Sequence, residues 1–229
     1  MRNTPLLARG MSMLSRRTII VGMPLLIAGC ATSQQQAPLA DAQPFDSGSN
    51  GANYGPIAGE PYPVRAINLA RVDPDLLRQE VAYSGPYAPG TIVVDIPSRR
   101  LYLVQPAGSA LRYGVGVGRL EALNFRGSAI IGRKAEWPTW TPTESMMQSL
   151  PRYRAYAGGV PGGAENPLGP RALYLYRGNE DTHFRLHGTT EPQSIGKAVS
   201  SGCIRLFNQD IIDLYKRVPI GAALVVMQA

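Results

Sequence analysis

Short hydrophobic runs, each bounded by turn-forming residues, dominate the chain from residue 90 onward. Several are β-branched, and the run at 111–118 alternates apolar and small residues as a half-buried strand does, because successive strand side chains point to opposite faces. These runs predict strands at residues 91–96, 101–104, 111–118, 129–132, 172–176, 184–187 and 223–227. We therefore expect a mostly β domain over residues 90–229, with one or two short helices near its C-terminus.

Two segments carry helix signals. Residues 73–81 begin with Asp73 as a candidate cap and Pro74 at the first helical position. Near the C-terminus, Asn208 is a candidate cap for a helix over residues 209–217. The residues predicted to form the buried side of this second helix are Ile211, Ile212, Leu214 and Tyr215.

The segment from Trp137 to Pro170 is long, rich in Gly and Pro, and only weakly helical near residues 144–147. Loops of this length inside a compact domain are usually functional or flexible. Trp137, Trp140 and Tyr153 could form a wall of a substrate site, and they could equally plug the core of a small β domain. The role of this segment stays open on sequence alone.

Composition narrows the possible classes of protein. Hydrophobic residues make up 44% of the 229 residues, which is typical of a globular chain, and 25 Gly with 20 Pro argue against a helical bundle. The net charge is +7, but residues 1–29 hold four arginines and no acid, which leaves +3 for the remainder. A basic nucleic-acid-binding face is therefore not indicated. Two Cys and two His are too few for the usual zinc site, so we expect no metal.

The first thirty residues have the pattern of an export signal. Arg16 and Arg17 precede an apolar run over residues 19–29, which predicts a signal peptide and resembles a twin-arginine signal. Residues 27–30 (IAGC) resemble the lipobox of bacterial lipoproteins, in which Cys30 would be lipidated. By the same resemblance, Ala31 in place of Asp favours sorting to the outer membrane, if the cell has one. The alternative is ordinary cleavage nearby, with Cys30 incidental.

Residues 30–60 are rich in Gln, Ala, Ser, Gly and Pro, and we expect a flexible tether there, followed by an N-terminal extension over residues 61–89. Together with the signal, this pattern predicts an exported periplasmic protein that is held to a membrane through Cys30 and faces the cell wall.

The densest polar stretches are residues 187–192 (HGTTEP) and 200–205 (SSGCIR). A nucleophilic cysteine needs a base, donors for an oxyanion and access, and His187, 16 residues before Cys203, could supply the base. Gly202 lets the backbone turn, and Arg205 offers a positive charge. From spacing alone, an inert core thiol and a structural histidine remain as alternatives.

These stretches together resemble the L,D-transpeptidase catalytic domain of the YkuD or ErfK/YbiS/YcfS type. The resemblance is carried by His187-Gly188-Thr189, by Ser200 to Arg205, and by residues 166–169 (NPLG) and 217–221 (RVPIG). It extends from residue 90 to the end of the chain and implies an L,D-transpeptidase-like β-sandwich. One departure is Ser201, where many members carry His.

The resemblance implies that Cys203 attacks the bond before the terminal D-alanine of a peptidoglycan stem peptide. It implies that His187 holds the thiolate as an ion pair and exchanges the proton, that the Gly188 carbonyl orients the imidazole, and that backbone N–H groups near Ser201, Gly202 and Cys203 form the oxyanion hole. No cofactor is required.

Two further residues have roles with alternatives. We expect Arg205 to bind a stem-peptide carboxylate, with a structural ion pair as the alternative. His183 lies four residues before His187, on the same face if the strand is regular. We interpret it as a structural or rim-lining residue.

Three functions remain open from sequence. An amine acceptor, from a second stem or from a protein such as an outer-membrane protein, makes the chain an L,D-transpeptidase. Water as acceptor makes it an L,D-carboxypeptidase. The third possibility is a non-catalytic lipoprotein that binds the wall.

Overall fold

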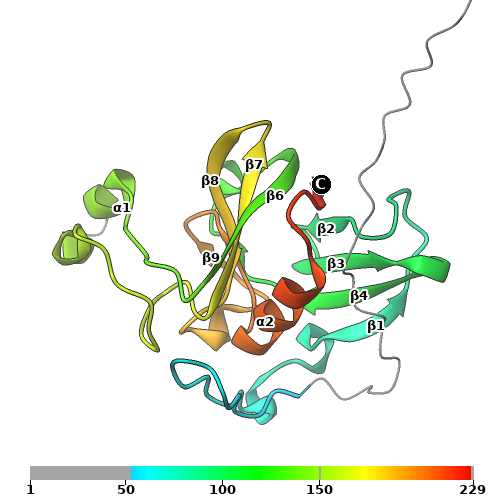
Figure 1. Cartoon of the computed structure of the whole chain (residues 1–229), viewed down its shortest axis with the longest axis horizontal. Helices are drawn as coiled ribbons and strands as arrows, with labels where there is room; N and C mark the ends of the chain where they lie inside the picture. Colours follow the sequence, from blue (N-terminus) through cyan, green and yellow to red (C-terminus); the bar gives the residue numbers. More distant parts are fainter. Residues whose placement is uncertain (1–52, 150, 228–229) are drawn as a thin grey trace, which may run out of the picture. The chain divides into compact units, whose positions relative to one another are not determined.

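The computed structural model describes residues 53–149 and 151–227 (Figure 1). The expected signal peptide, Cys30 and the expected tether as far as residue 52 lie outside these residues. Within the described part, no helix is both long and apolar enough to span a membrane.

The described strands are β1 (Gln79–Ala82), β2 (Ile92–Asp95), β3 (Arg100–Gln105), β4 (Ser109–Gly114), β5 (Val117–Gly118), β6 (Gly127–Glu136), β7 (Arg171–Arg177), β8 (Glu180–His187), β9 (Ala198–Ser200), β10 (Ile204–Arg205) and β11 (Ala223–Met227). The α-helices are α1 (Glu144–Ser149) and α2 (Asn208–Arg217). Short 3₁₀ helices cover Leu69–Arg71, Pro74–Leu76, Pro106–Gly108, Glu121–Leu123, Pro151–Tyr156 and Pro192–Ser194. The expected mostly β fold is confirmed.

Among the described residues, nine strands form one sheet in the order β1-β4-β3-β2-β11-β6-β7-β8-β10, and β5 pairs with β9. The last strand, β11, lies between β2 and β6, parallel to the first and antiparallel to the second. One buried core joins Ile92 and Leu101 on one side of β11 to Leu173 and Leu175 on the other. Because both halves of the sheet share a core, the sheet packs on itself as in a sandwich.

Helix α2 packs on β7 and β8 (Figure 1). Ile211, Ile212 and Leu214 are buried as expected, and Tyr215 is partly buried. The expected cap is wrong in one respect, because Phe207 is the residue before the helix and its side chain makes no capping bond. The side chain of Asn208 is used elsewhere, as described below.

The helix expected over residues 73–81 is wrong beyond its first turn. Asp73 does cap the segment, and Pro74 does begin it, but the helix is a 3₁₀ turn that ends at Leu76. Residues 79–82 form β1 instead and pair with β4. Pairing supplies backbone partners along the whole strand, whereas a helix this short leaves most of its end groups unpaired.

Residues 53–60, which composition assigns to the tether, contact the domain. Tyr54 is only 4% exposed, and its hydroxyl donates to the Asp210 carboxylate on α2 at 2.9 Å. The Glu60 carboxylate accepts two bonds from Arg171, at 2.7 and 2.9 Å, and one from the Trp137 indole at 2.9 Å. The expectation of a tether is therefore wrong for these residues, because a few specific contacts order a polar segment.

The segment from 137 to 170 contains α1, and hydrogen bonds from the Asn166 side chain hold parts of it together. The Asn166 amide donates to the carbonyls of Pro138, Val160 and Pro161 at 2.9 to 3.0 Å. Trp140 packs edge-on against Tyr153, with ring centres 5.5 Å apart. Both interactions lie within the segment, so Trp140 and Tyr153 pack against it rather than plug the main core.

Candidate active site

Parallel pairing of β8 with β10 brings the two expected reactive residues onto neighbouring strands. Leu186 lies opposite Ile204, and His187 lies opposite Arg205. Cys203 directly precedes β10, so it comes next to the position of Arg185 on β8. The intervening loop thus folds back and places Cys203, 16 positions after His187, at the start of the neighbouring strand and two residues away from it in register.

His187 ends β8 with its ring fixed. The side chain is 5% exposed, and its Nδ1 lies 2.6 Å from the Gly188 carbonyl oxygen. A carbonyl only accepts hydrogen bonds, so Nδ1 carries the proton and Nε2 is left as the acceptor. Burial, reinforced by the positive charges of Arg205 and Arg185, lowers the pKa of His187 to about 3 despite the bond to Gly188. The imidazole is therefore neutral near pH 7.

The loop after His187 is tightly enclosed. A Cβ atom on Gly188 would lie 2.3 Å from the Asn208 side-chain oxygen and 2.9 Å from the Pro170 ring. That same oxygen accepts the Thr189 N–H at 2.8 Å. Asn208 therefore anchors the loop that orients His187. Sequence reasoning missed this role, because an Asn before a helix reads as a cap.

Cys203 is a free cysteine, and the residue as a whole is partly exposed. Its Sγ lies 3.9 Å from the His183 carbonyl oxygen. Burial raises the pKa of the Cys203 thiol, although a hydrogen bond from the Arg185 backbone and the charges of Arg185 and Arg205 act in the opposite direction. The two shifts therefore favour a neutral thiol at Cys203 and a neutral imidazole at His187 in the free protein.

Backbone N–H groups around Cys203 are not equally available. The Gly202 N–H donates to the Ser200 hydroxyl at 3.1 Å, and this hydroxyl donates to the Cys203 carbonyl at 2.7 Å. The prediction that the Gly202 N–H is an oxyanion-hole donor is therefore wrong, because this N–H already donates to the Ser200 hydroxyl. Within the described part of the chain, the N–H groups of Ser201 and Cys203 have no hydrogen-bond partner.

Gly202 is still required for the turn. Its φ is +128°, and a Cβ atom there would lie 2.3 Å from the Leu123 carbonyl oxygen. The Ser200 hydroxyl stabilises this turn through its bonds to Gly202 and Cys203. Ser200 is 2% exposed, and no role was predicted for it from the sequence.

Arg205 makes the structural ion pair that was the alternative to substrate binding. Its Nη1 lies 2.6 Å from a Glu191 carboxylate oxygen. The Arg205 side chain is 21% exposed and that of Glu191 is 57% exposed. Because the Glu191 carboxylate is open to solvent, this ion pair contributes little to stability.

His183 does not follow a regular strand. Its φ is +62°, and the register between β7 and β8 shifts at this point. The expected shared face with His187 is therefore wrong, since the bulge breaks the alternation. His183 is exposed, and its carbonyl, not its ring, contacts Cys203. Over residues 53–149 and 151–227, no group of three or more His, Cys, Asp or Glu residues is arranged to hold a metal.

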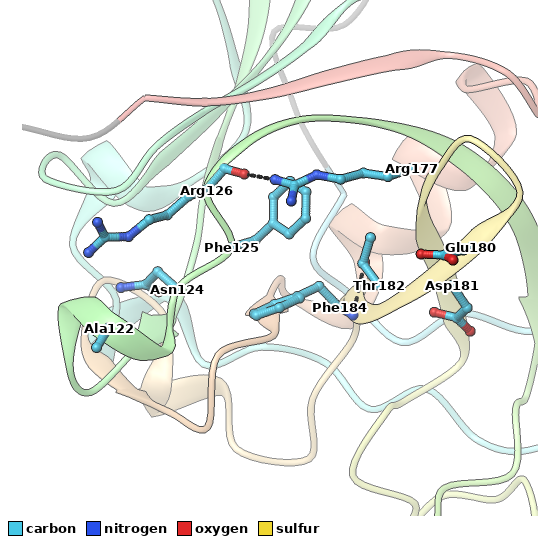
Figure 2. A pocket seen from close by; sticks show the side chains of 9 residues that line it. All are labelled: Ala122, Asn124, Phe125, Arg126, Arg177, Glu180, Asp181, Thr182 and Phe184. Atoms are coloured by element: carbon cyan, nitrogen blue, oxygen red, sulfur yellow. Dashed lines mark hydrogen bonds between the residues drawn. The ribbon is translucent and has the colours of Figure 1, made fainter.

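A cavity of about 360 Å³ lies beside this turn (Figure 2). Phe125 and Phe184 line it edge-to-face, with ring centres 5.2 Å apart. Phe184 also approaches Gly202, because a Cβ there would lie 3.1 Å from its ring. The other lining residues are Ala122, Asn124, Arg126, Arg177, Glu180, Asp181 and Thr182. The cavity therefore adjoins the turn at Gly202 through Phe184, and Cys203 is not among its lining residues.

A family model described as the L,D-transpeptidase catalytic domain, YkuD, matches residues 89–227. The chain belongs to the YkuD family of L,D-transpeptidases. The match contains β2 to β11 and every residue of the site described above. It leaves out residues 53–88, so the contacts of Tyr54 and Glu60 come from outside the family domain.

Curated relatives carry the same family name. Probable L,D-transpeptidase ErfK/SrfK of Escherichia coli K12 is 36% identical over 57% of this chain and 41% of its own length. Probable L,D-transpeptidase YcfS of the same organism is 33% identical over 71% of this chain and 49% of its own length. The chain thus spans less than half the length of both relatives.

Two solved structures also match the chain. A structure from Brucella melitensis, named a probable carnitine operon oxidoreductase, is 46% identical over 70% of this chain and 99% of that chain, with a TM-score of 0.47. An L,D-transpeptidase from Mycobacterium smegmatis is 19% identical over 60% of this chain and 58% of that chain, with a TM-score of 0.45. The family assignment rests on the sequence match.

Proposed function

We propose that this member of the family forms a thioester between Cys203 and a peptidoglycan stem peptide and releases the terminal D-alanine. The observation that carries the proposal is the 2.6 Å contact between His187 Nδ1 and the Gly188 carbonyl. It leaves Nε2 unprotonated on the strand beside Cys203. A fixed base, a thiol and unpaired N–H groups are the parts that acyl transfer needs.

The chemistry begins from neutral groups. As the Cys203 sulfur attacks the substrate carbonyl carbon, its proton passes to Nε2 of His187. The N–H groups of Ser201 and Cys203 donate to the oxyanion. When the C–N bond breaks, the imidazolium gives its proton to the leaving nitrogen of D-alanine, and the thioester remains.

The second half-reaction reverses these transfers. An acceptor amine attacks the thioester carbonyl and gives a proton to His187. That proton returns to the sulfur as the C–S bond breaks, and a new amide is formed. Water in place of the amine gives a carboxylic acid, which is the L,D-carboxypeptidase reaction.

A neutral resting pair differs from the ion pair that the family resemblance implies. Burial lowers the pKa of His187 and raises that of Cys203, and each shift disfavours the charged form. Charge therefore develops only during attack, where the oxyanion donors can stabilise it.

Export and anchoring are part of the same proposal. The arginine pair at 16–17 and the lipobox-like residues 27–30 support export and lipidation of Cys30. The family domain would then face the cell wall from a membrane, in the periplasm. The acceptor would be a second stem peptide or a wall-facing protein.

The test is mass spectrometry of the full chain incubated with a disaccharide tetrapeptide. We expect an acyl adduct on Cys203 and release of D-alanine, and neither in Cys203→Ala. Cys30→Ala is the matched control, because it removes the other cysteine of the chain and leaves the site at Cys203 intact. A crosslinked dimer indicates a transpeptidase and a tripeptide alone indicates a carboxypeptidase. Substrate binding by the wild type without release of D-alanine would refute the proposal in favour of a wall-binding lipoprotein.

A further inference from the structure

The Arg185 guanidinium is held at three points. Its two terminal nitrogens donate to the two oxygens of Asp181 at 2.7 and 2.9 Å. One of them also donates to the Phe184 carbonyl at 2.9 Å. The guanidinium carbon lies 4.2 Å from the ring centre of Tyr174, which is its partner across β7 and β8. A planar guanidinium fixed by a bidentate carboxylate and a ring has little freedom to move.

The bulge in β8 makes this arrangement possible. Tyr174 pairs with Arg185 and Tyr176 pairs with Asp181, so one residue on β7 faces three on β8. His183 takes a φ of +62°, and its N–H donates to Asp181 at 2.8 Å. The extra residues bring the Asp181 carboxylate back towards Arg185. The same bulge directs the His183 carbonyl to the Cys203 sulfur.

Arg185 is adjacent to the reactive pair. It is two residues before His187 on β8, so both side chains lie on one face of the strand. The register of β8 with β10 brings Cys203 next to the Arg185 position. On the other side of the bulge, Asp181 forms part of the cavity wall in Figure 2.

We propose that Arg185, locked by Asp181 and Tyr174, is a positioning residue that holds a fixed positive charge beside the Cys203 sulfur. This charge stabilises the thiolate when the proton leaves. The inference rests on Cys203 being the nucleophile of the proposed function, but it concerns the thiol itself and not the substrate.

The surrounding charges agree in direction. Arg185 and Arg205 both lower the pKa of Cys203, whereas Asp181 raises it by less than Arg185 lowers it. The same two arginines also lower the pKa of His187 and keep it a neutral base. Arg205 is itself paired with the Glu191 carboxylate. Of the two arginines, Arg185 therefore has the larger effect on the pKa of the Cys203 thiol.

The test is the rate at which iodoacetamide alkylates Cys203 in the full chain, read by peptide mass spectrometry between pH 5.5 and 10. Peptide-level detection separates Cys203 from Cys30. In Arg185→Met, we expect at least threefold slower alkylation at pH 7 and a pH profile displaced to higher pH. Arg185→Lys keeps the charge but loses the fork and the ring contact, so we expect an intermediate rate.

Arg133→Met is the matched control. The Arg133 guanidinium lies 3.5 Å from the same Tyr174 ring, but on β6, two strands away from β8. It should alkylate like the wild type. Thermal unfolding shows whether each variant folds. If Arg185→Met does not fold, the pH profile of Arg185→Lys is compared with that of the wild type instead.

A wild-type pH profile in Arg185→Met would overturn the proposal, and a wild-type profile in Arg185→Lys would overturn the need for a locked position. Failure of the proposed function has a different signature. In that case the alkylation profile still shifts, while the wild type releases no D-alanine.

Discussion

Replacing Asn208 with alanine should damage both stability and the orientation of His187. The Asn208 oxygen accepts the N–H of Thr189, and Thr189 is only 4% exposed. Without that acceptor, the N–H is left buried and unpaired. Such a group costs about 1 to 3 kcal/mol, so we expect the free energy of unfolding to fall by that amount.

The kinetic effect follows from the geometry of the loop. Thr189 is next to Gly188, whose carbonyl holds the His187 ring. A displacement near 1 Å in a reacting group can cost roughly a hundredfold in rate, and we expect a loss of that order in the release of D-alanine. Urea unfolding measures the first effect, and the D-alanine assay measures the second.

Asn208→Asp is the control, because it keeps an oxygen at the same position and no other bond of the Asn208 side chain is found among the described residues. It should retain most of the stability and rate. Our reasoning is refuted if Asn208→Ala behaves like the wild type, or if Asn208→Asp is as impaired as Asn208→Ala.

Three other predictions use the same assays. Gly188→Ala should lose activity and stability, because its Cβ would lie 2.3 Å from the Asn208 oxygen. Gly158→Ala should keep its activity, because no atom lies within 4 Å of its Cβ and its backbone is outside the left-handed region; equal activity in both variants would contradict this. Glu60→Ala should lower the free energy of unfolding by about 3 kcal/mol, since it removes the two short bonds to the buried Arg171 and leaves only a 3.6 Å contact with the half-exposed Glu136 carboxylate. Glu165→Ala, in an exposed pair, should change it by less than about 1 kcal/mol, and similar losses in both variants would exclude this account. Burial lowers the pKa of His187 to about 3, so between pH 6.5 and 3 the unfolded chain binds a proton that the folded chain does not, and stability falls as the pH falls. In His187→Gln this fall should be shallower by up to about 1.4 kcal/mol per pH unit, and an unchanged slope in urea unfolding would count against it.

The local pattern predicted most strands because it depends on neighbours in sequence. Residues 91–96, 172–176 and 223–227 are β-branched or aromatic runs, and the buried faces of β2, β7 and β11 follow from them. β1 was missed because its residues are mostly exposed and polar, so only its pairing with β4 defines it. An edge strand of this kind has no periodicity of its own to detect.

The site was predictable in its residue types but not in its hydrogen bonds. His187 and Cys203 were identified from their motif, yet the use of the Gly202 N–H depends on where the Ser200 hydroxyl points. Asn208 suits a helix cap and a loop anchor equally, since both use its side-chain oxygen. Only the position of Thr189, 19 residues away, decides between them.

Residues outside the family domain are connected to the site through α2. Tyr54 binds Asp210 from a position 156 residues earlier in the chain, and the Gln209 amide donates to the Tyr54, Gly55 and Arg65 carbonyls. These contacts lie within the first turn of the helix, beside Asn208. No local pattern near Tyr54 indicates a partner so far along the chain. The composition of this segment therefore predicts a tether instead. Since Asn208 holds the loop of His187, the segment at 53–65 fixes the helix end that positions the base. The family domain alone therefore does not contain all of the contacts that order its own site.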